Sequence, residues 1–309
     1  MRIGIDASYE NKTLLSFIKT ELRLSHRLLS RLKRTENGIL VNGKNVTVRY
    51  ILKSGDVLEL ADGDIEPSET VEPVDISVDI IYESEDILAV NKPANMPTHP
   101  SHGHTNDTLA NAAAFLYRGK NFVFRPINRL DRNTSGIVLI AKNQRAASFL
   151  SNALKNGEFE KTYIAAVDGR IDRGGEIEKH IKRTEGSIIT RTVCSPDDKG
   201  AQYAFTEYSP ISFCDTHSLL CVMPKTGRTH QIRVHLASIG SPICGDDLYG
   251  NESPLIDRHA LHAYSLAFPL LSGERVTLFA PLPDDMVKLA SAAGLRIPEK
   301  IQTRKPRNL

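Results

Sequence analysis

Residues 125–141 have the sequence RPINRLDRNTSGIVLIA, in which a segment dense in charge continues directly into an apolar strand. Its carboxylate, Asp131, stands among three arginines, so nearby positive charge is expected to keep it ionised and available as a nucleophile. An isolated Arg-x-Asp is more often a surface ion pair. The residues alone therefore leave two interpretations open, a reactive carboxylate or an ordinary ion pair.

The same segment carries a motif of a known family. Its core, RLDRNTSG at residues 129–136, resembles the catalytic loop of the RluA-type pseudouridine synthases. The resemblance implies that Asp131 is the essential carboxylate and that Arg129 occupies the space vacated by a flipped base. Histidine usually precedes that arginine, whereas here Asn128 does, and an amide can hydrogen-bond but cannot become a cation. Asn128 is therefore expected to contact the substrate without contributing charge.

A second motif lies at residues 160–167, EKTYIAAV, whose alternation by itself predicts only a strand. Taken alone, its tyrosine would be an ordinary strand residue with a solvated hydroxyl. In the resembling family, the tyrosine of this Lys-Thr-Tyr sequence lies against the target base. It is also a candidate for removing the proton from carbon five of that base. The resemblance assigns both roles to Tyr163.

A third motif, GRTHQIRVHL at residues 227–236, is followed by GSPICGDDLYG at residues 240–250, again in the order of the family. The resemblance makes Arg233 the partner of the catalytic aspartate, because a buried Arg–Asp pair keeps the carboxylate charged. It also implies that Arg228 holds phosphate or the loop and that Ile232 packs against the base. Asp131, Tyr163 and Arg233 are thus the predicted catalytic residues.

The first sixty residues predict a small unit with two helices and a hairpin. Apolar residues recur at helical spacing after Thr13 and again over residues 28–32, so two short helices are expected. Within residues 39–46, Asn42-Gly43 supplies the positive φ angles of a tight hairpin turn. A further strand is expected after Asp56.

This order of elements over residues 13–60 resembles the αL-type RNA-binding domain of ribosomal proteins. The second helix interleaves its apolar stripe with positive charge suited to RNA phosphates. A solvated basic face explains the same pattern equally well. The side chains predicted to bind RNA are Arg27, Arg31, Lys33 and Arg34.

Charge is unevenly distributed along the 309 residues, although the formal total is only +2. Residues 1–60 contain eleven Lys/Arg against six Asp/Glu, and residues 61–86 contain ten acidic residues and no Lys/Arg. The segment from Arg296 contains five Lys/Arg and one glutamate. Two basic segments therefore flank an acidic connector.

Motifs and charge together predict an α+β protein. The expected parts are a small RNA-binding domain (1–60), an acidic linker (61–79), a catalytic domain (80–295) and a basic C-terminal tail (296–309). In the catalytic domain, the irregular mixture of strands and helices favours a mainly antiparallel sheet with flanking helices over a regular βαβ sheet.

Neither a cofactor nor a metal is expected. The resemblance implies an isomerisation of uridine, which adds and removes nothing overall, and no dinucleotide or phosphate-loop fingerprint competes. His99, His102 and His104 cluster, but they lie in a segment that resembles a family loop which needs no metal, and no carboxylate completes a ligand set. The four cysteines are widely spaced and are interpreted as buried thiols.

The expected partner is structured RNA, with ribosomal RNA, of the large subunit in particular, favoured over transfer RNA. No obligate protein partner is evident, and a monomer is expected. No stretch approaches the roughly 20 apolar residues of a membrane span. Because the first residues also lack a signal-peptide pattern, a cytoplasmic protein is expected.

Two other function classes fit parts of the sequence. A noncatalytic RNA-binding or ribosome-assembly protein would use the same basic surfaces, and Asp131 would then merely brace a loop. A carbohydrate-active hydrolase would need a second acid near the motifs, and none is convincing. For a synthase, attack of the carboxylate at the sugar and assistance of an elimination remain alternatives.

Overall fold

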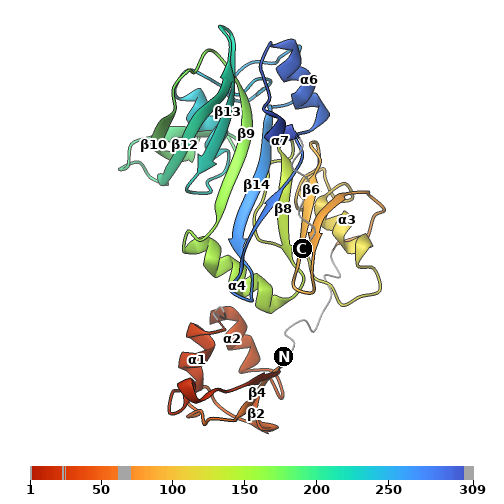
Figure 1. Ribbon diagram of the computed structural model, residues 1–309, viewed down its shortest axis with the longest axis vertical. Helices are drawn as coiled ribbons and strands as arrows, with labels where there is room; N and C mark the ends of the chain where they lie inside the picture. Colours follow the sequence, from red (N-terminus) through yellow and green to blue (C-terminus); the bar gives the residue numbers. More distant parts are fainter. Residues whose placement is uncertain (1, 23, 25, 62–70, 303–309) are drawn as a thin grey trace.

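The computed structural model describes residues 2–22, 24, 26–61 and 71–302, without the side chains of His26, Arg27, Lys300 and Gln302. The predicted role of Arg27, residues 62–70 of the acidic linker and residues 303–309 of the basic tail lie outside the described residues. The described chain forms two sheets with associated helices, which gives the predicted α+β fold. The N-terminal unit, which contains the smaller sheet, lies next to helix α4 (Gln144–Lys155) of the larger unit, with its helices nearer to α4 than its sheet (Figure 1).

The N-terminal sheet is antiparallel, with strand order β1-β4-β2-β3. Its unit consists of β1 (Arg2–Gly4), a 3-10 helix (Ala7–Tyr9), α1 (Leu14–Thr20), α2 (His26–Leu32), β2 (Ile39–Val41), β3 (Lys44–Asn45) and β4 (Val57–Leu60). Thr13 accepts a hydrogen bond from the Ser16 backbone and so begins α1. Asn42 and Gly43 have φ angles of 51° and 74°, as the predicted hairpin turn requires. The two helices, the hairpin and the following strand are confirmed, and β1 was not predicted.

The large sheet has eleven strands and is antiparallel except where β8 meets β14. Its main order is β11-β10-β12-β13-β9-β14-β8-β6-β5, with β15 beside β14 and β7 beside β8. The strands are β5 (Asp79–Glu83), β6 (Ile87–Lys92), β7 (Arg125–Pro126), β8 (Ser135–Ala141), β9 (Glu160–Asp168), β10 (Gly175–Arg183), β11 (Arg191–Cys194), β12 (Gln202–Phe213), β13 (His217–Pro224), β14 (Leu261–Pro269) and β15 (Arg275–Phe279). Besides α4, the helices are α3 (Leu109–Leu116), α5 (Gln231–Ala237), α6 (Asp284–Ala292) and α7 (Glu299–Gln302).

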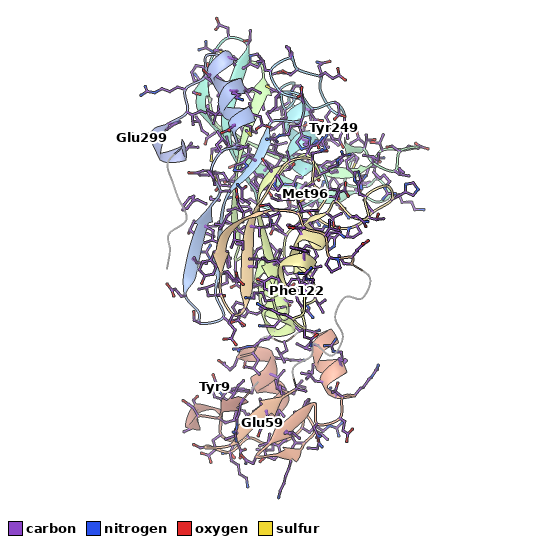
Figure 2. All side chains as sticks on the ribbon, turned by 90° about the vertical axis from the view of Figure 1, so that its right-hand side faces the viewer. Tyr9, Glu59, Met96, Phe122, Tyr249 and Glu299 are labelled. Carbon is purple, nitrogen blue, oxygen red and sulfur yellow. The ribbon has the colours of Figure 1, made fainter. Side chains whose placement is uncertain are left out.

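Strand β8 is apolar along its length because both faces of the sheet are covered there. Successive side chains of a strand point to opposite faces. Within residues 137–141, the odd-numbered side chains pack in a cluster that includes α4. The even-numbered ones pack with α3, Met96 and Phe122 (Figure 2). The loop that contains Asp131 (residues 127–134), the predicted catalytic loop, therefore runs into a strand that is fixed from both sides.

The parallel joint between β8 and β14 brings together the loops that precede the two strands. Ser135 and Gly136 pair with His262 and Ala263. At Gly136 φ is +111°, and a Cβ would lie 2.3 Å from the carbonyl oxygen of Ala263, so a side chain does not fit. The glycine of the Thr-Ser-Gly sequence is thus required by the joint, which sets the loop of Asp131 against the loop before β14.

In the part of the chain that the structure describes, no helix combines the length and the apolar character that crossing a membrane requires.

Candidate active site

A pocket of about 880 Å³ lies between the loop before β8 and the segment before α5. Side chains from the start of β9 complete its wall. All seven residues predicted to act in catalysis or substrate binding line it, namely Asn128, Arg129, Asp131, Tyr163, Arg228, Ile232 and Arg233. Three motifs that are distant in sequence therefore meet in one cavity, and the role of each residue stays a prediction.

Tyr163 reaches this pocket because β9 lies between β13 and β14. Its neighbours across the strands are Val222 and Ala263, and Ala263 also pairs with Gly136 at the end of the catalytic loop. Burial raises the pKa of the Tyr163 phenol, and the charge of Asp131 raises it further. The phenol is therefore protonated at neutral pH. To take a proton from carbon, it would first have to give up its own.

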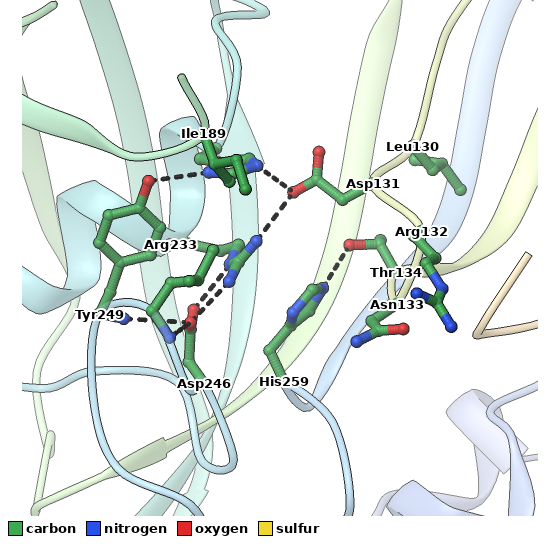
Figure 3. A network of polar contacts seen from close by, with 12 residues as sticks. Leu130, Asp131, Arg132, Asn133, Thr134, Ile189, Arg233, Asp246, Tyr249 and His259 are labelled. Carbon is green, nitrogen blue, oxygen red and sulfur yellow. Dashed lines mark hydrogen bonds and ion pairs between the residues drawn. The ribbon is translucent and has the colours of Figure 1, made fainter. Parts of the chain in front are cut away.

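Arg233 lies between two carboxylates (Figure 3). Its Nε and Nη2 donate to Asp246 Oδ2 and Oδ1 at 2.7 and 2.6 Å, whereas Nη1 lies 3.5 Å from Asp131 Oδ2. The side chain of Asp246 is 0% exposed and that of Asp131 is 29% exposed. Asp131, the predicted partner of Arg233, thus lies beside it but farther away than Asp246 does. Asp246, to which the sequence motif gave no role, is its main partner.

The Arg233–Asp246 pair is ionised although it is buried. Burial alone would raise the pKa of Asp246, but the hydrogen bonds and charge of Arg233 outweigh burial and lower it. The backbone N–H groups of Leu248 and Tyr249 also donate to Asp246 Oδ1, at 3.1 and 3.2 Å. Arg233 is therefore a fixed positive charge beside Asp131.

Lys92, at the end of β6, hydrogen-bonds to the backbone of the loop that contains Asp131. No role was predicted for it from the sequence. Its side chain is fully buried, and Nζ donates to the carbonyls of Pro93, Met96 and Arg132 at 2.7, 2.8 and 3.1 Å. Burial lowers the pKa of Lys92 to about 7, and Arg258 lowers it too, while Asp131 raises it. Three carbonyls satisfy the three donors of an ammonium group. Lys92 therefore ties the loop after β6 to the catalytic loop.

The loop before β14 holds the catalytic loop from its other side. His259 Nε2 lies 2.8 Å from Thr134 Oγ1 (Figure 3), and Arg258 Nη1 donates to the carbonyl of Asn133 at 2.9 Å. Arg258 is itself held by Asp285, at 2.7 and 3.0 Å. Burial lowers the pKa of His259 to about 3, so the ring is neutral. These contacts depend on the parallel joint and have no signal in the sequence.

Asn128 uses its amide on the backbone of β8. Its Nδ2 donates to the carbonyl of Ile137 and its Oδ1 accepts from the N–H of Leu139, both at 2.9 Å. The side chain thus continues the strand pairing, and both of its polar atoms are engaged. The expected contact of Asn128 with substrate would therefore have to be a van der Waals contact, or a hydrogen bond accepted by the remaining lone pair of Oδ1.

The segment before α5 is fixed by Gln231. Its Oε1 accepts from Thr226 Oγ1 and from the Arg228 backbone at 2.7 and 3.0 Å, and its Nε2 donates to the carbonyl of Phe205 and to Thr206 Oγ1, both at 2.9 Å. The Nε of Arg228 donates to the Tyr203 carbonyl at 2.9 Å. This arrangement presents Ile232 and Arg233 to the pocket while keeping Ile232 buried.

The predicted RNA-binding side chains are not alike. Lys33 and Arg34 are exposed just after α2. Arg31 instead donates to Gln144 Oε1 of α4, which links the N-terminal unit to the large one. The three side chains of the set that the structure describes, Arg31, Lys33 and Arg34, are all exposed, and Arg31 differs by its additional contact with α4.

The histidines considered from the sequence as metal ligands do not form a ligand group among the described residues. One group of three potential ligands does occur there, Asp168, His217 and Cys244. Its members already interact with one another, since the Cys244 thiol bonds to Asp168 and His217 Nε2 lies 3.7 Å from the same carboxylate. The interpretation of all four cysteines as buried thiols was wrong. Only Cys244 is buried, whereas Cys194, Cys214 and Cys221 are partly exposed.

Comparison with known proteins gives concordant matches. A model of the family described as RNA pseudouridylate synthase matches residues 86–238. The "Uncharacterized RNA pseudouridine synthase YjbO" of Bacillus subtilis is 40% identical over 273 residues, covering 87% of this chain and 95% of that protein. Ribosomal large subunit pseudouridine synthase D of Vibrio cholerae is 35% identical over 283 residues, with coverages of 85% and 86%. The mitochondrial tRNA pseudouridine(32) synthase of Saccharomyces cerevisiae is 35% identical over 223 residues, with coverages of 71% and 47%.

Proposed function

Because this chain belongs to the RNA pseudouridine synthase family, we propose that it isomerises specific uridines in structured RNA, with Asp131 as its catalytic carboxylate. The observation that carries the proposal is the gathering of Asp131, Tyr163 and Arg233 around a single pocket. In that pocket Asp131 is partly exposed and Arg233 is fixed by another partner. A carboxylate held in this way is charged and still accessible.

In the proposed reaction, the bond from uracil N1 to ribose C1′ breaks and a bond from uracil C5 to the same carbon forms. The proton on C5 is lost and one is gained at N1, so atoms and electrons balance without a cofactor. Asp131 either attacks C1′ or assists an elimination at the sugar. Tyr163, as a neutral phenol, supports the released base by contact and hydrogen bonding.

The target nucleotide must leave its stack to reach the pocket. Unstacking costs a few kcal/mol, roughly, in enzymes that flip bases. Arg129 lines the pocket beside Asp131 and is proposed to fill the vacated space. Ile232 offers an apolar surface to the base, and Arg228 offers positive charge to a phosphate.

Large-subunit ribosomal RNA is the favoured substrate in this proposal. The match to an enzyme named for the ribosomal large subunit covers more of the chain than the match to an enzyme named for transfer RNA. The N-terminal unit, with exposed Lys33 and Arg34, is proposed to add affinity for RNA phosphates. Transfer RNA is the alternative.

The experiment is release of tritium from RNA labelled at uridine C5. Unmodified ribosomal and transfer RNA pools are each incubated with the wild type and with Asp131→Asn. Release by the wild type alone is expected, and the pool that releases identifies the RNA class. Tight RNA binding without release from either pool would reject the proposal in favour of a noncatalytic RNA-binding protein.

A further inference from the structure

His230 and Tyr249 form a chain of polar contacts that ends at the catalytic carboxylate. The Nε2 of His230 lies 3.8 Å from Asp131 Oδ2, and its Nδ1 lies 2.8 Å from the Tyr249 hydroxyl. That hydroxyl accepts the backbone N–H of Arg191, the first residue of β11, at 2.8 Å. The chain therefore runs from the backbone of a strand through a phenol and an imidazole to Asp131.

The direction of these hydrogen bonds follows from the donors available. A backbone N–H can only donate, so Tyr249 Oη accepts from Arg191 and keeps its own proton for another partner. The neighbour in position to receive that proton is His230 Nδ1. In a neutral imidazole one nitrogen accepts and the other carries the proton. Donation by Tyr249 therefore places the ring proton on Nε2, the nitrogen that faces Asp131.

The surroundings of His230 favour the neutral ring. Burial lowers the pKa of His230, Arg233 and Arg191 also lower it, and Asp131 and Asp246 raise it, with a net lowering. The side chain is only 11% exposed. Burial, together with the two arginines, thus outweighs the two carboxylates and favours the uncharged imidazole.

The backbone at His230 supports a specific use of the side chain. Its φ and ψ angles are 57° and 16°, a left-handed conformation that residues with a Cβ rarely adopt and that recurs at functional sites. The side chain makes no capping hydrogen bond to α5, although the residue stands at its N-terminus. Both ring nitrogens are instead directed to Tyr249 and Asp131.

We propose that His230 is a positioning residue which, held by Tyr249 in the tautomer with its proton on Nε2, selects the reacting oxygen of Asp131. The inference rests on the proposed role of Asp131. His230 Nε2 and Arg233 Nη1 both make their closest approach to Oδ2, at 3.8 and 3.5 Å. Catalytic hydrogen bonds are often long without substrate and shorten when it binds. Two donors on Oδ2 leave Oδ1 to react at the sugar.

The test is Tyr249→Phe in the full-length protein. Phenylalanine keeps the ring, over which the Arg233 guanidinium lies at 5.1 Å, and removes only the hydroxyl. The matched control is Tyr117→Phe, which removes a hydroxyl bonded to Glu83 at 2.6 Å outside the pocket. The tautomer of His230 is followed by proton–nitrogen correlation spectra of protein labelled with 15N-histidine, with His230→Gln identifying its signals.

In the wild type we expect His230 to be neutral with its proton on Nε2. In Tyr249→Phe we expect a mixture of tautomers, with kcat lowered about 5- to 30-fold and KM changed less than about twofold. Tyr117→Phe should change neither the His230 signals nor kcat. A wild-type proton on Nδ1, a charged ring at neutral pH, or equal kcat in the two phenylalanine variants would overturn the proposal. An inactive wild type with the expected tautomer would instead reject the proposed function.

Discussion

The catalytic loop and the turn after α5 present carboxylates to the same arginine but hold them differently. Asp246, in the turn, is fully buried and has both oxygens bonded at 2.6 to 3.2 Å. Asp131, in the loop, is partly exposed and lies 3.5 Å from Arg233. A buried charge requires complete pairing, whereas a reacting carboxylate must keep one oxygen free. This difference is the one expected between a structural carboxylate, Asp246, and the reacting carboxylate proposed at Asp131.

The largest effect is expected for Asp131→Asn. Turnover should fall at least about a thousandfold, because the amide is neither a nucleophile nor a base. The free energy of unfolding should change by less than about 1 kcal/mol, since a partly exposed ion pair contributes little. Single-turnover tritium release and urea unfolding measure the two quantities. A large loss of stability would mean that Asp131 is structural as well.

Asp246→Asn, unlike Asp131→Asn, should cause a large loss of stability. It leaves Arg233 buried beside a neutral amide, and breaking a buried pair in this way costs about 3–5 kcal/mol of stability. Urea unfolding at pH 7 measures the loss, with Asp131→Asn as the matched control of the same chemical change. Equal stability in the two variants would show that the two carboxylates are held alike.

The placement of Asp131 beside Arg233 also depends on the parallel pairing of β8 with β14. Gly136→Ala should disrupt this pairing. The new Cβ meets the Ala263 carbonyl, so overlap and left-handed strain together should cost about 2–5 kcal/mol. Gly157→Ala is the control, because φ is +77° there and nothing lies within 4 Å of its Cβ. That variant should lose only about 1–2 kcal/mol. Similar losses in thermal or urea unfolding would contradict this account of the joint.

Acid should destabilise the folded protein by protonating three buried histidines. Burial lowers the pKa of His235, His259 and His262 to about 4, 3 and 4. Below pH 6.5 the unfolded chain binds more protons than the folded one, so the free energy of unfolding falls as pH falls towards 4. The slope is about 1.4 kcal/mol per pH unit for each histidine. Urea unfolding from pH 7 to 4.5 should show it.

In His235→Gln the slope of the free energy of unfolding against pH should be smaller by about 1.4 kcal/mol per pH unit. An unchanged slope would mean that His235 is not neutral in the folded protein.

The smallest effect concerns the N-terminal unit. Replacing Lys33 and Arg34 together by alanine should reduce the slope of log K against log salt for RNA binding by about 1–2. The control replaces Lys44 and Arg49, which are also exposed, so the net charge change is the same. Equal slopes in the two double variants would remove the basis for an RNA-binding face at the end of α2.

The sequence by itself determined which motifs supply the side chains that line the pocket, and most of the elements that carry them. Strand β8 was evident from its apolar run, β9 from its alternation, and the Asn42-Gly43 hairpin from its turn residues. The seven residues predicted to line the site do so. Patterns of this kind are local, because they depend on backbone preferences and on which side chains avoid water.

Only the tertiary structure decided which groups meet. It assigned Arg233 chiefly to Asp246, directed the amide of Asn128 to β8, and placed Lys92 under the catalytic loop. It also placed Tyr249 beside His230. Each of these contacts crosses between segments or strands, and its partner depends on sheet order, the parallel joint and the orientation of a turn. Hydrogen-bond partners over such distances are set by packing in three dimensions, which residue spacing along a chain does not encode.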